Sequence, residues 1–229
     1  KSKELGYSKL DLLHYYIACC YFELKKFDKA IITLNSIPKN SDQIKIGYVE
    51  ELMISSKYQL NKYKEVIKDA DEFISLYKLN PDDVNNELNL KFIEDNLSIV
   101  SQIYFHYINS LNSISDFENS IKIGNQYLKI AKTITNEIEV GRAFYRLAEV
   151  KKAKGDYLAS LQDINETLKI KDFYDYSYSA YLTRAEIKLA IGSKKAACED
   201  FDISLKIAND QKVNDDIIKI SNFIKENCN

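Results

Sequence analysis

The chain has 229 residues, of which 45% are hydrophobic and 29% are charged, so it can bury a continuous core and keep a solvated surface. Its net charge of −2 argues against a nucleic-acid-binding protein, because such proteins need a basic surface that releases counterions. The chain has only 6 Gly and 2 Pro, which indicates an almost entirely helical protein with short turns. It has no run of about 18 apolar residues, so we expect no transmembrane segment.

The first predicted helix pair spans residues 11–38. On its first helix, Tyr15 and Tyr16 lie on the side that would face the inside of a stack of such pairs. Its second helix ends at Pro38, because proline cannot continue the ladder of backbone hydrogen bonds. We expect residues 1–9, which are polar, to be frayed or to form the tail of an earlier element.

A loop at residues 39–42 offers a cap for the second pair, residues 44–77. Residues 78–96 then interrupt the pattern, and within them Asn80-Pro81-Asp82-Asp83 indicates a turn followed by good helix-starting residues. We interpret the segment as an inserted loop with a short helix. The alternative is that it extends the first helix of the third pair, residues 97–132. Such insertions often lie on a binding face, although a tolerated surface insertion is an equally good interpretation.

The fourth pair, residues 139–170, shows the pattern most clearly. Two amphipathic helices are joined there by a tight turn at Gly155, where a positive φ is easiest without a side chain. The fifth pair, residues 178–208, repeats the arrangement. Residues 213–228 form one more amphipathic helix, which we expect to cover the open end of the stack.

The pairs recur at steps of 36 to 40 residues, apart from one longer step. The residues that we take as equivalent turn positions are Lys25, Asn61, Ser115, Gly155 and Gly192. The steps between them are 36, 54, 40 and 37 residues. A repeat length in the thirties predicts an all-α helical solenoid in which each pair contacts mainly its neighbours.

Three segments carry a resemblance to a known family: AYLTRAEIKLAIGSKKAACEDFDISLKI, GRAFYRLAEVKKAKGDYLASLQDINETLKI and YYIACCYFELKKFDKAIITLNSI. They resemble the tetratricopeptide repeat family, and the resemblance covers most of residues 10–208. It implies a right-handed α-α superhelix of about five helix pairs, here followed by a C-terminal capping helix. The chain departs from the family at Ile54 and Ile108, where a small residue is preferred, at Val66, which replaces Ala, and at Lys194, which replaces an aromatic residue.

The resemblance implies a non-catalytic scaffold that binds a peptide or partner protein in the concave groove. An alternative is a ligand- or peptide-responsive sensor domain of a bacterial regulatory protein, in which binding changes the superhelix pitch. Further DNA-binding or kinase sequence in the full-length gene would favour the sensor. The groove residues that we expect to contact a partner are Tyr15, Tyr16, Phe105, Asn109, Arg142, Tyr145 and Arg146.

Arg142 and Arg146 form the sharpest local feature, because they lie one helical turn apart and flank Tyr145. Some family members grip a C-terminal carboxylate with Lys and Asn side chains from three consecutive repeats, and the two arginines match the basic pair of the last one. The other slots of that clamp hold Glu51, Ser55 and His106 instead. The alternative is internal pairing of Arg142 with Glu139 and of Arg146 with Glu149.

The four cysteines differ in what they predict. We expect Cys20 to be a small core residue and Cys19 to lie on the inner face or to be semi-buried. The segment KAACEDFDISLKIA and the terminal IKENC resemble the C-terminal ends of repeat proteins from Bacteroidetes-type bacteria. In that setting a disulfide between Cys198 and Cys228 would hold the capping helix, and the alternative is two buried or unpaired thiols in a cytoplasmic protein.

Nothing in the sequence indicates an enzyme, a cofactor or a metal site. His14 and His106 lie in different repeats without a carboxylate or Cys at suggestive spacing, and no phosphate loop or hydrolase motif is present. No signal peptide is visible, although the chain starts at Lys1 and a targeting segment could precede it. The paired cysteines favour a bacterial periplasm or cell envelope, with the cytoplasm as the alternative location.

Overall fold

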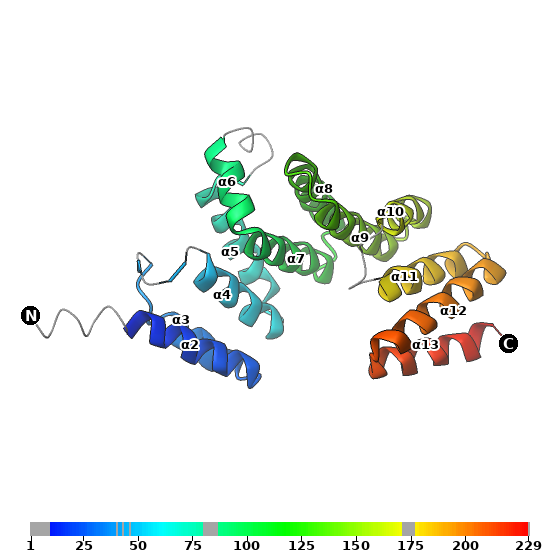
Figure 1. The fold of residues 1–229 in the computed structure, drawn as a ribbon, viewed down its shortest axis with the longest axis horizontal. Coiled ribbons are helices and arrows are strands. Elements are labelled where there is room, and N and C mark those ends of the chain that lie inside the picture. The colour runs from blue at the N-terminus through cyan, green and yellow to red at the C-terminus, as the bar shows by residue number, and fades with distance from the viewer. Residues whose placement is uncertain are drawn as a thin grey trace, which may run out of the picture. The chain divides into compact units, whose positions relative to one another are not determined.

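The computed structural model describes residues 10–39, 41–42, 44–45, 47–79, 87–170 and 177–228. These ranges contain twelve α-helices and no strand (Figure 1). The chain divides into two compact units, Lys1–Asp116 and Phe117–Asn229, which we describe separately. The predicted turn at Asn80-Pro81-Asp82-Asp83 lies outside the described residues. The loop at residues 39–42 does not cap the second pair, because the first helix of that pair starts at Tyr48 with Gly47 as the N-cap residue and no side-chain cap hydrogen bond.

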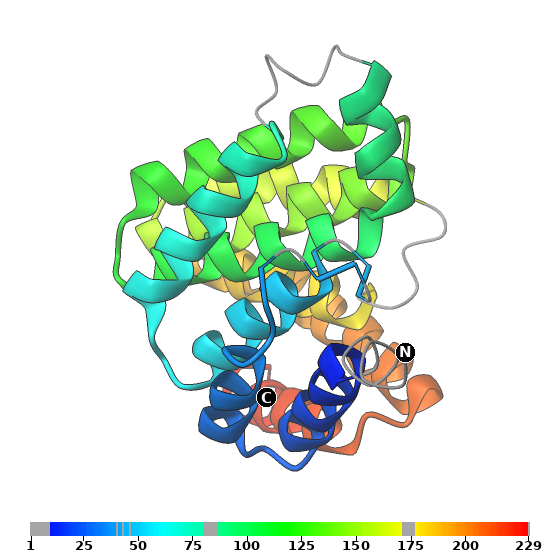
Figure 2. The ribbon, with the colours of Figure 1, turned by 90° about the vertical axis from the view of Figure 1, so that its left-hand side faces the viewer.

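The first unit consists of two regular helix pairs, a short helix and one long helix. Its helices are α2 (Leu10–Glu23), α3 (Phe27–Leu34), α4 (Tyr48–Gln59), α5 (Tyr63–Leu76), α6 (Glu87–Asp95) and α7 (Leu97–Ser113). Each helix packs on the next as far as α5, and α7 then packs against both α4 and α5, as Figure 2 shows from a second direction. The short helix α6 lies within the segment that we interpreted as an insertion, and its Phe92 stacks on Tyr77 with ring centroids 4.7 Å apart.

The second unit continues the alternation of antiparallel helices. It contains α8 (Phe117–Thr133), α9 (Glu137–Lys154), α10 (Tyr157–Lys169), α11 (Ser177–Ala190), α12 (Lys194–Gln211) and α13 (Asn214–Asn227). Each of these helices packs on its successor. The two helices of the predicted third pair therefore belong to different units, with α7 in the first and α8 in the second.

All five predicted turn positions share one backbone geometry. Their φ angles are positive: 56° at Lys25, 57° at Asn61, 60° at Ser115, 89° at Gly155 and 82° at Gly192. In every case the next residue donates its backbone N–H to the carbonyl five residues earlier, over 2.8–3.0 Å. This left-handed C-terminal cap satisfies carbonyls that the helix end would otherwise leave unpaired. Three of the five positions adopt it without the conformational freedom of glycine.

Small residues let the paired helices approach each other closely. Ala18, Ala148 and Ala185 have no exposed surface, and neither does Ser160. The Ser160 hydroxyl donates to the carbonyl oxygen of Ala148 over 2.6 Å, which joins α9 to α10. Ile54 also lies in the core, although it stands at a position where the family prefers a small residue. Bulk at this position is therefore accommodated by the packing of α4.

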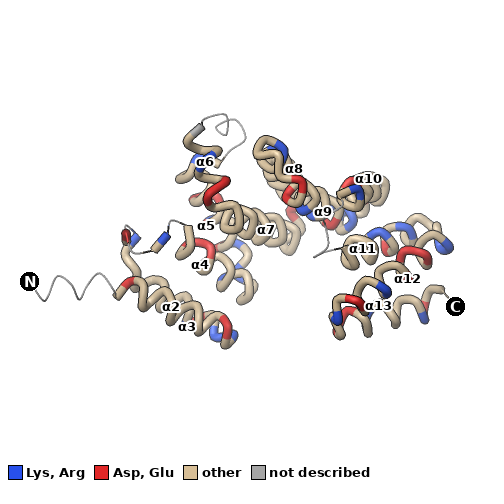
Figure 3. Tube along the Cα trace, in the orientation of Figure 1, with Lys and Arg blue, Asp and Glu red and all other residues tan. Residues whose placement is uncertain are grey.

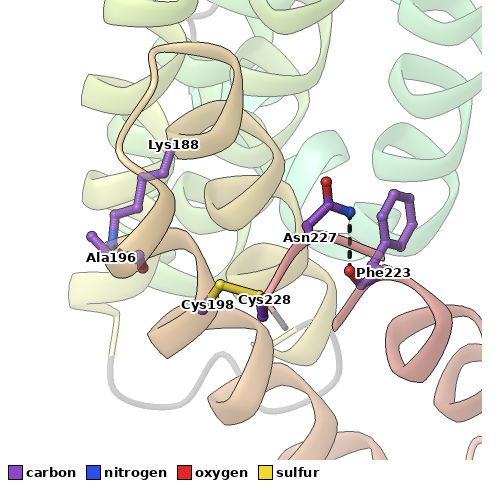
Figure 4. Close-up of a disulfide and its surroundings, with 6 residues drawn as sticks. All are labelled: Lys188, Ala196, Cys198, Phe223, Asn227 and Cys228. Atoms are coloured by element: carbon purple, nitrogen blue, oxygen red, sulfur yellow. Dashed lines mark hydrogen bonds between the residues drawn. A yellow bond between two sulfur atoms is a disulfide. The ribbon is translucent and has the colours of Figure 1, made fainter. Parts of the chain in front are cut away.

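The capping helix α13 packs on α12 through apolar contacts. Ile220 is fully buried, and the rings of Phe201 and Phe223 stack with centroids 5.7 Å apart. Figure 4 shows a disulfide from Cys198, near the start of α12, to Cys228, just after α13. Its sulfur atoms are 2.04 Å apart and the two Cα atoms 5.7 Å apart. The bond therefore links a residue near the start of α12 to the residue that follows the last turn of α13.

One core prediction is wrong. Cys20 is exposed, whereas Cys19 is half-buried and packs beside the core formed by Ala18, Leu34 and Leu52. Adjacent residues on a helix point about 100° apart, so the core that receives Cys19 cannot also receive Cys20.

Among the described residues, no helix is both long enough and apolar enough to cross a membrane.

Candidate functional site

The first helices of three successive pairs lie beside one another in the first unit. Helix α4 contacts α2 on one side and α7 on the other. The predicted partner-binding residues of this unit come from the outer two helices. On α2, Tyr15 is half-buried and Tyr16 is 58% exposed, while Phe105 and Asn109 on α7 are both half-buried. We call the surface formed by α2, α4 and α7 the first-helix face.

Aromatic rings line the first-helix face on both sides of α4. The Tyr15 ring meets Tyr48 edge-on, with centroids 6.1 Å apart. On the other side, Tyr58 lies 6.2 Å from Phe105 and 4.7 Å from the His106 ring. Partly exposed aromatic rings of this kind supply large contact area at a low cost in side-chain entropy, which suits a peptide-binding surface.

A chain of hydrogen bonds runs through the middle of this face. The Ser55 hydroxyl donates to Oε1 of Glu51 over 2.6 Å, and the same hydroxyl oxygen lies 2.8 Å from Nε2 of His106. A serine hydroxyl has one proton, and a carboxylate oxygen can only accept, so Nε2 must carry the proton that is donated to Ser55. Both hydrogen bonds are therefore directed toward the Glu51 carboxylate.

This arrangement does not form a catalytic nucleophile. In a nucleophile–base pair the serine proton must point at the imidazole, whereas the Ser55 proton is committed to Glu51. Ser55 is also only 4% exposed, so a substrate carbonyl has no approach to its oxygen. No group of three His, Cys, Asp or Glu side chains suited to a metal ion occurs in the part of the chain that the structure describes.

The three helices that form the first-helix face carry more acidic than basic side chains. They contain Asp11, Glu23, Glu50 and Glu51 against Lys57, and of these Glu50 is directed toward the second helix of its pair. Figure 3 shows α7 without any Lys, Arg, Asp or Glu. Lys57 is engaged on α5, where its Nζ lies 2.6 Å from Asp69. Burial raises the pKa of the Glu51 carboxyl, and the hydrogen bond from Ser55 opposes that rise. Burial also raises the pKa of Tyr15, and the nearby charge of Glu51 adds to the effect.

In the second unit, the predicted arginine pair is compensated by internal carboxylates. Arg142 Nη1 lies 2.5 Å from Glu139 Oε1, and Arg146 Nη1 lies 3.8 Å from Glu149 Oε2. These are the two pairs that we weighed as the alternative to a carboxylate pocket. The Arg146 guanidinium also lies 5.1 Å from the centre of the Tyr145 ring, and that ring is only 7% exposed. Tyr145 therefore packs in the core rather than offering its ring to solvent.

The same compensation extends along both first helices of this unit. Every Lys and Arg on α9 and α11 has a carboxylate within 4 Å: Arg142, Arg146, Lys151, Lys152, Lys154, Arg184 and Lys188. Arg184 forms a two-point ion pair, because its Nε and Nη2 both donate to the carboxylate of Asp200, over 2.8 and 2.7 Å. An external carboxylate would have to compete with these internal partners.

An open depression of about 540 Å³ lies between α10 and α11, outside the predicted site. Its lining residues are Gln162, Asn165, Glu166, Leu168, Lys169, Tyr181 and Arg184. Both of its cations are already paired, Lys169 with Glu166 at 2.5 Å and Arg184 with Asp200. The depression therefore offers little to a charged ligand.

Comparison with known proteins identifies the fold. No family model matches the chain, and no curated protein does. Among solved structures, the apo form of RapI superposes with a TM-score of 0.76 at 12% identity, covering 95% of this chain and 77% of RapI. A Rap protein complexed with competence and sporulation factor gives 0.65 at 15% identity, over 90% of this chain. This chain spans little more than half of that protein, 56%.

A third structure names the repeat. TTC0263, a thermophilic TPR protein in Thermus thermophilus, superposes with a TM-score of 0.59 at 10% identity. The match covers 93% of this chain and 97% of TTC0263. Identities this low carry information about the fold alone. The chain is an all-α solenoid of the tetratricopeptide-repeat type.

Proposed function

We propose that this chain is a non-catalytic scaffold that binds a peptide or partner protein on the first helices of its repeats. The observation that carries the proposal is the first-helix face, where half-exposed aromatic side chains surround a polar centre. Tyr15, Tyr16, Phe105 and Asn109 are the proposed contacts on this face. A surface preformed by helix packing would bind without ordering the scaffold, which favours affinity.

Arg142, Tyr145 and Arg146 are the proposed contacts of the second unit. Their support is weaker, because both arginines already have carboxylate partners and the Tyr145 ring is buried. A ligand carboxylate would bind there only by displacing Glu139 or Glu149. We therefore rank the first-helix face ahead of the arginine pair as the principal contact surface.

Affinity capture with matched variants tests the proposal. Immobilised wild-type chain would be compared with the Tyr16→Ala/Phe105→Ala double variant and with Ile32→Ala as the control. Ile32 is an exposed apolar residue, 67% accessible, on α3, which is a second helix of the same unit. The expected result is a partner that wild type and Ile32→Ala retain and the double variant loses. Equal retention by all three proteins would place binding elsewhere and refute this assignment.

A ligand-responsive sensor domain is the second candidate. The observation in its favour is the fold likeness to a Rap protein solved with competence and sporulation factor, since this chain spans only part of that protein. A sensor must change shape on binding, whereas a rigid scaffold need not. Small-angle scattering of the chain with and without its captured partner separates the two, because only the sensor predicts a changed scattering profile.

The C-terminal likeness to repeat proteins of Bacteroidetes-type bacteria supports a bacterial origin for the chain. A disulfide between Cys198 and Cys228 would persist in an oxidising compartment and not in the cytoplasm. We therefore favour the periplasm or cell envelope as the location. Measuring the redox state of these two cysteines in intact cells, after acid quenching and thiol alkylation, tests that assignment.

A further inference from the structure

We infer that the first-helix face recognises a lysine side chain of its bound peptide, and that the Glu51 carboxylate is the acceptor for the lysine ammonium. The inference rests on the proposed function, because it requires that a peptide binds to this face. The charges are opposite to those of a clamp in which the scaffold supplies cations that bind a carboxylate of the ligand. The acceptor belongs to the scaffold, and the cation belongs to the ligand.

Glu51 is a half-buried carboxylate that the described residues supply with a neutral donor and no cation. Asp163, Asp200 and Glu139 are more deeply buried, and each has a Lys or Arg nitrogen within 4 Å. Among the described residues, no Lys or Arg nitrogen lies that close to Glu51, and its one side-chain donor is Ser55. A partly buried carboxylate with a single neutral donor gains more from an incoming cation than a paired one does.

The neighbours of Glu51 also suit a cation. Tyr15 and Cys19 on α2 lie close enough to Glu51 to feel its charge, and both are neutral at ordinary pH. Tyr58 lies two turns along the same face of α4, and its ring joins those of Phe105 and His106. Aromatic rings attract ammonium groups through their faces and cover the apolar stem of a lysine.

A lysine ammonium can reach the Glu51 carboxylate. Oε1 accepts from Ser55 over 2.6 Å, and each carboxylate oxygen has two lone pairs, so both oxygens can still accept from a ligand. A lysine ammonium is a compact donor that needs a single acceptor, and its flexible four-carbon stem can reach a half-buried group between helices. A peptide amino terminus lacks that stem.

The neighbouring residue Glu50 provides a matched control. It lies on the same helix and carries the same charge, but it accepts a hydrogen bond from Tyr77, which follows α5. Glu50→Gln and Glu51→Gln therefore remove one negative charge each from α4. Only Glu51→Gln removes the proposed acceptor, because Glu50 is directed toward the second helix of the pair.

The test uses a displayed library of random heptapeptides with blocked amino termini, selected against the wild-type chain. The selected peptides would be synthesised with lysine, with Nε-acetyl-lysine and with arginine at each lysine position. Their affinities for wild type, Glu50→Gln and Glu51→Gln would be measured by fluorescence anisotropy. Circular dichroism would establish that both variants are folded.

We expect the selected peptides to share a lysine whose acetylation lowers the affinity of wild type and of Glu50→Gln by about 10- to 100-fold, the range for a hydrogen bond to a charged group. Arginine at that position should retain part of the affinity, because it keeps the positive charge on a less compact head group. For Glu51→Gln, acetylation should change the affinity by less than about twofold, since the charge partner is gone.

The possible failures are distinguishable. Peptides that bind tightly without a shared lysine, or whose acetylation is felt equally by Glu51→Gln, would overturn the lysine assignment and leave the scaffold proposal standing. A library that yields no binder at all would overturn both. If Glu51→Gln fails to fold, the acetylated and unmodified peptides still decide the matter on wild type, because an insensitive affinity refutes the inference.

Discussion

Breaking the Cys198–Cys228 disulfide should lower the stability of the second unit substantially. The two cysteines are 30 residues apart in the chain, so the bond closes a loop of that length in the unfolded state. The loop-entropy model assigns about 3–4 kcal/mol to a loop of this size. We expect the free energy of unfolding of Cys228→Ser to be lower than that of wild type by about this amount.

Chemical denaturation followed by circular dichroism measures the effect. Wild type treated with dithiothreitol should match Cys228→Ser, and dithiothreitol should not change the variant. The control is Cys20→Ser, which removes an exposed thiol that forms no disulfide and should leave the free energy of unfolding within about 0.5 kcal/mol of wild type. Wild-type stability that does not respond to dithiothreitol would refute the reasoning.

A thiol count checks the same bond independently of stability. The chain has 4 cysteines, of which Cys19 and Cys20 are not in a disulfide. The unreduced protein, unfolded in guanidinium, should therefore titrate two thiols and the reduced protein four. Four thiols before reduction would contradict the bond.

Loss of the disulfide should act first on the capping helix. Helix α13 packs on α12 at one end of the chain of contacts in its unit, so it can detach without unfolding the other helices. Hydrogen exchange over Asn214–Asn227 should accelerate in Cys228→Ser, and trypsin should cleave at Lys219 and Lys225 before it cleaves elsewhere in the unit. Uniform acceleration across α8–α12 would show instead that the unit unfolds as a whole.

Three further predictions follow from local geometry. Ser115→Gly should stabilise the chain by about 0.5–1 kcal/mol, because Ser115 has φ 60° and glycine carries no side-chain penalty at positive φ. Gly155→Ser should destabilise the chain by a similar amount, because Gly155 has φ 89°. Thermal unfolding of the two variants and wild type measures both effects. Arg184→Ala should lower the free energy of unfolding, measured by urea denaturation, by about 1.5–3 kcal/mol. The Asp200 side chain is 3% exposed and would keep Lys188, at 2.6 Å, as its cationic partner. Arg184→Lys should not fully restore the loss, because lysine cannot bind both carboxylate oxygens. Glu51→Gln should be the more stable protein at neutral pH. Burial raises the folded-state pKa of Glu51 above its ordinary 4.5, so the folded state holds the proton more tightly than the unfolded state does. The free energy of unfolding of wild type therefore falls as the pH rises from 4.5 through the folded-state pKa. The stability advantage of the glutamine variant should vanish below pH 4.5, and an advantage that does not change with pH would contradict the argument.

The turns were predictable from sequence because they depend on local geometry. Glycine at two of the five positions marked the left-handed residue directly, and the repeating pattern of helix pairs carried the assignment to Lys25, Asn61 and Ser115, across one longer step of 54 residues. All five adopt the same positive φ and the same closing hydrogen bond. A signal repeated in the chain needs no knowledge of tertiary contacts.

The polar centre of the first-helix face could not be derived in that way. Ser55 and His106 are 51 residues apart, and the step between their repeats is disturbed by the segment at residues 78–96. In the sequence, Glu51, Ser55 and His106 occupy the slots that a carboxylate clamp would fill with Lys and Asn. Their hydrogen bonds required the register of α4 against α7. By contrast, the pair of Arg142 and Glu139 is three residues apart on one helix, so the sequence suggested it.

Charged side chains on the first helices are paired within the fold to different degrees, and this difference supports the proposed binding surface. In the second unit every cation of α9 and α11 is matched by a carboxylate of the protein, so these charges are already satisfied by the fold. In the first unit Glu51 is partly buried with Ser55 as its donor, an arrangement that costs stability in the free protein. A residue that serves binding can lower the stability of the free protein, because stability and function often make opposing demands. Glu51→Gln should therefore increase stability and weaken peptide binding together, and that opposition would distinguish a binding residue from one that merely packs poorly.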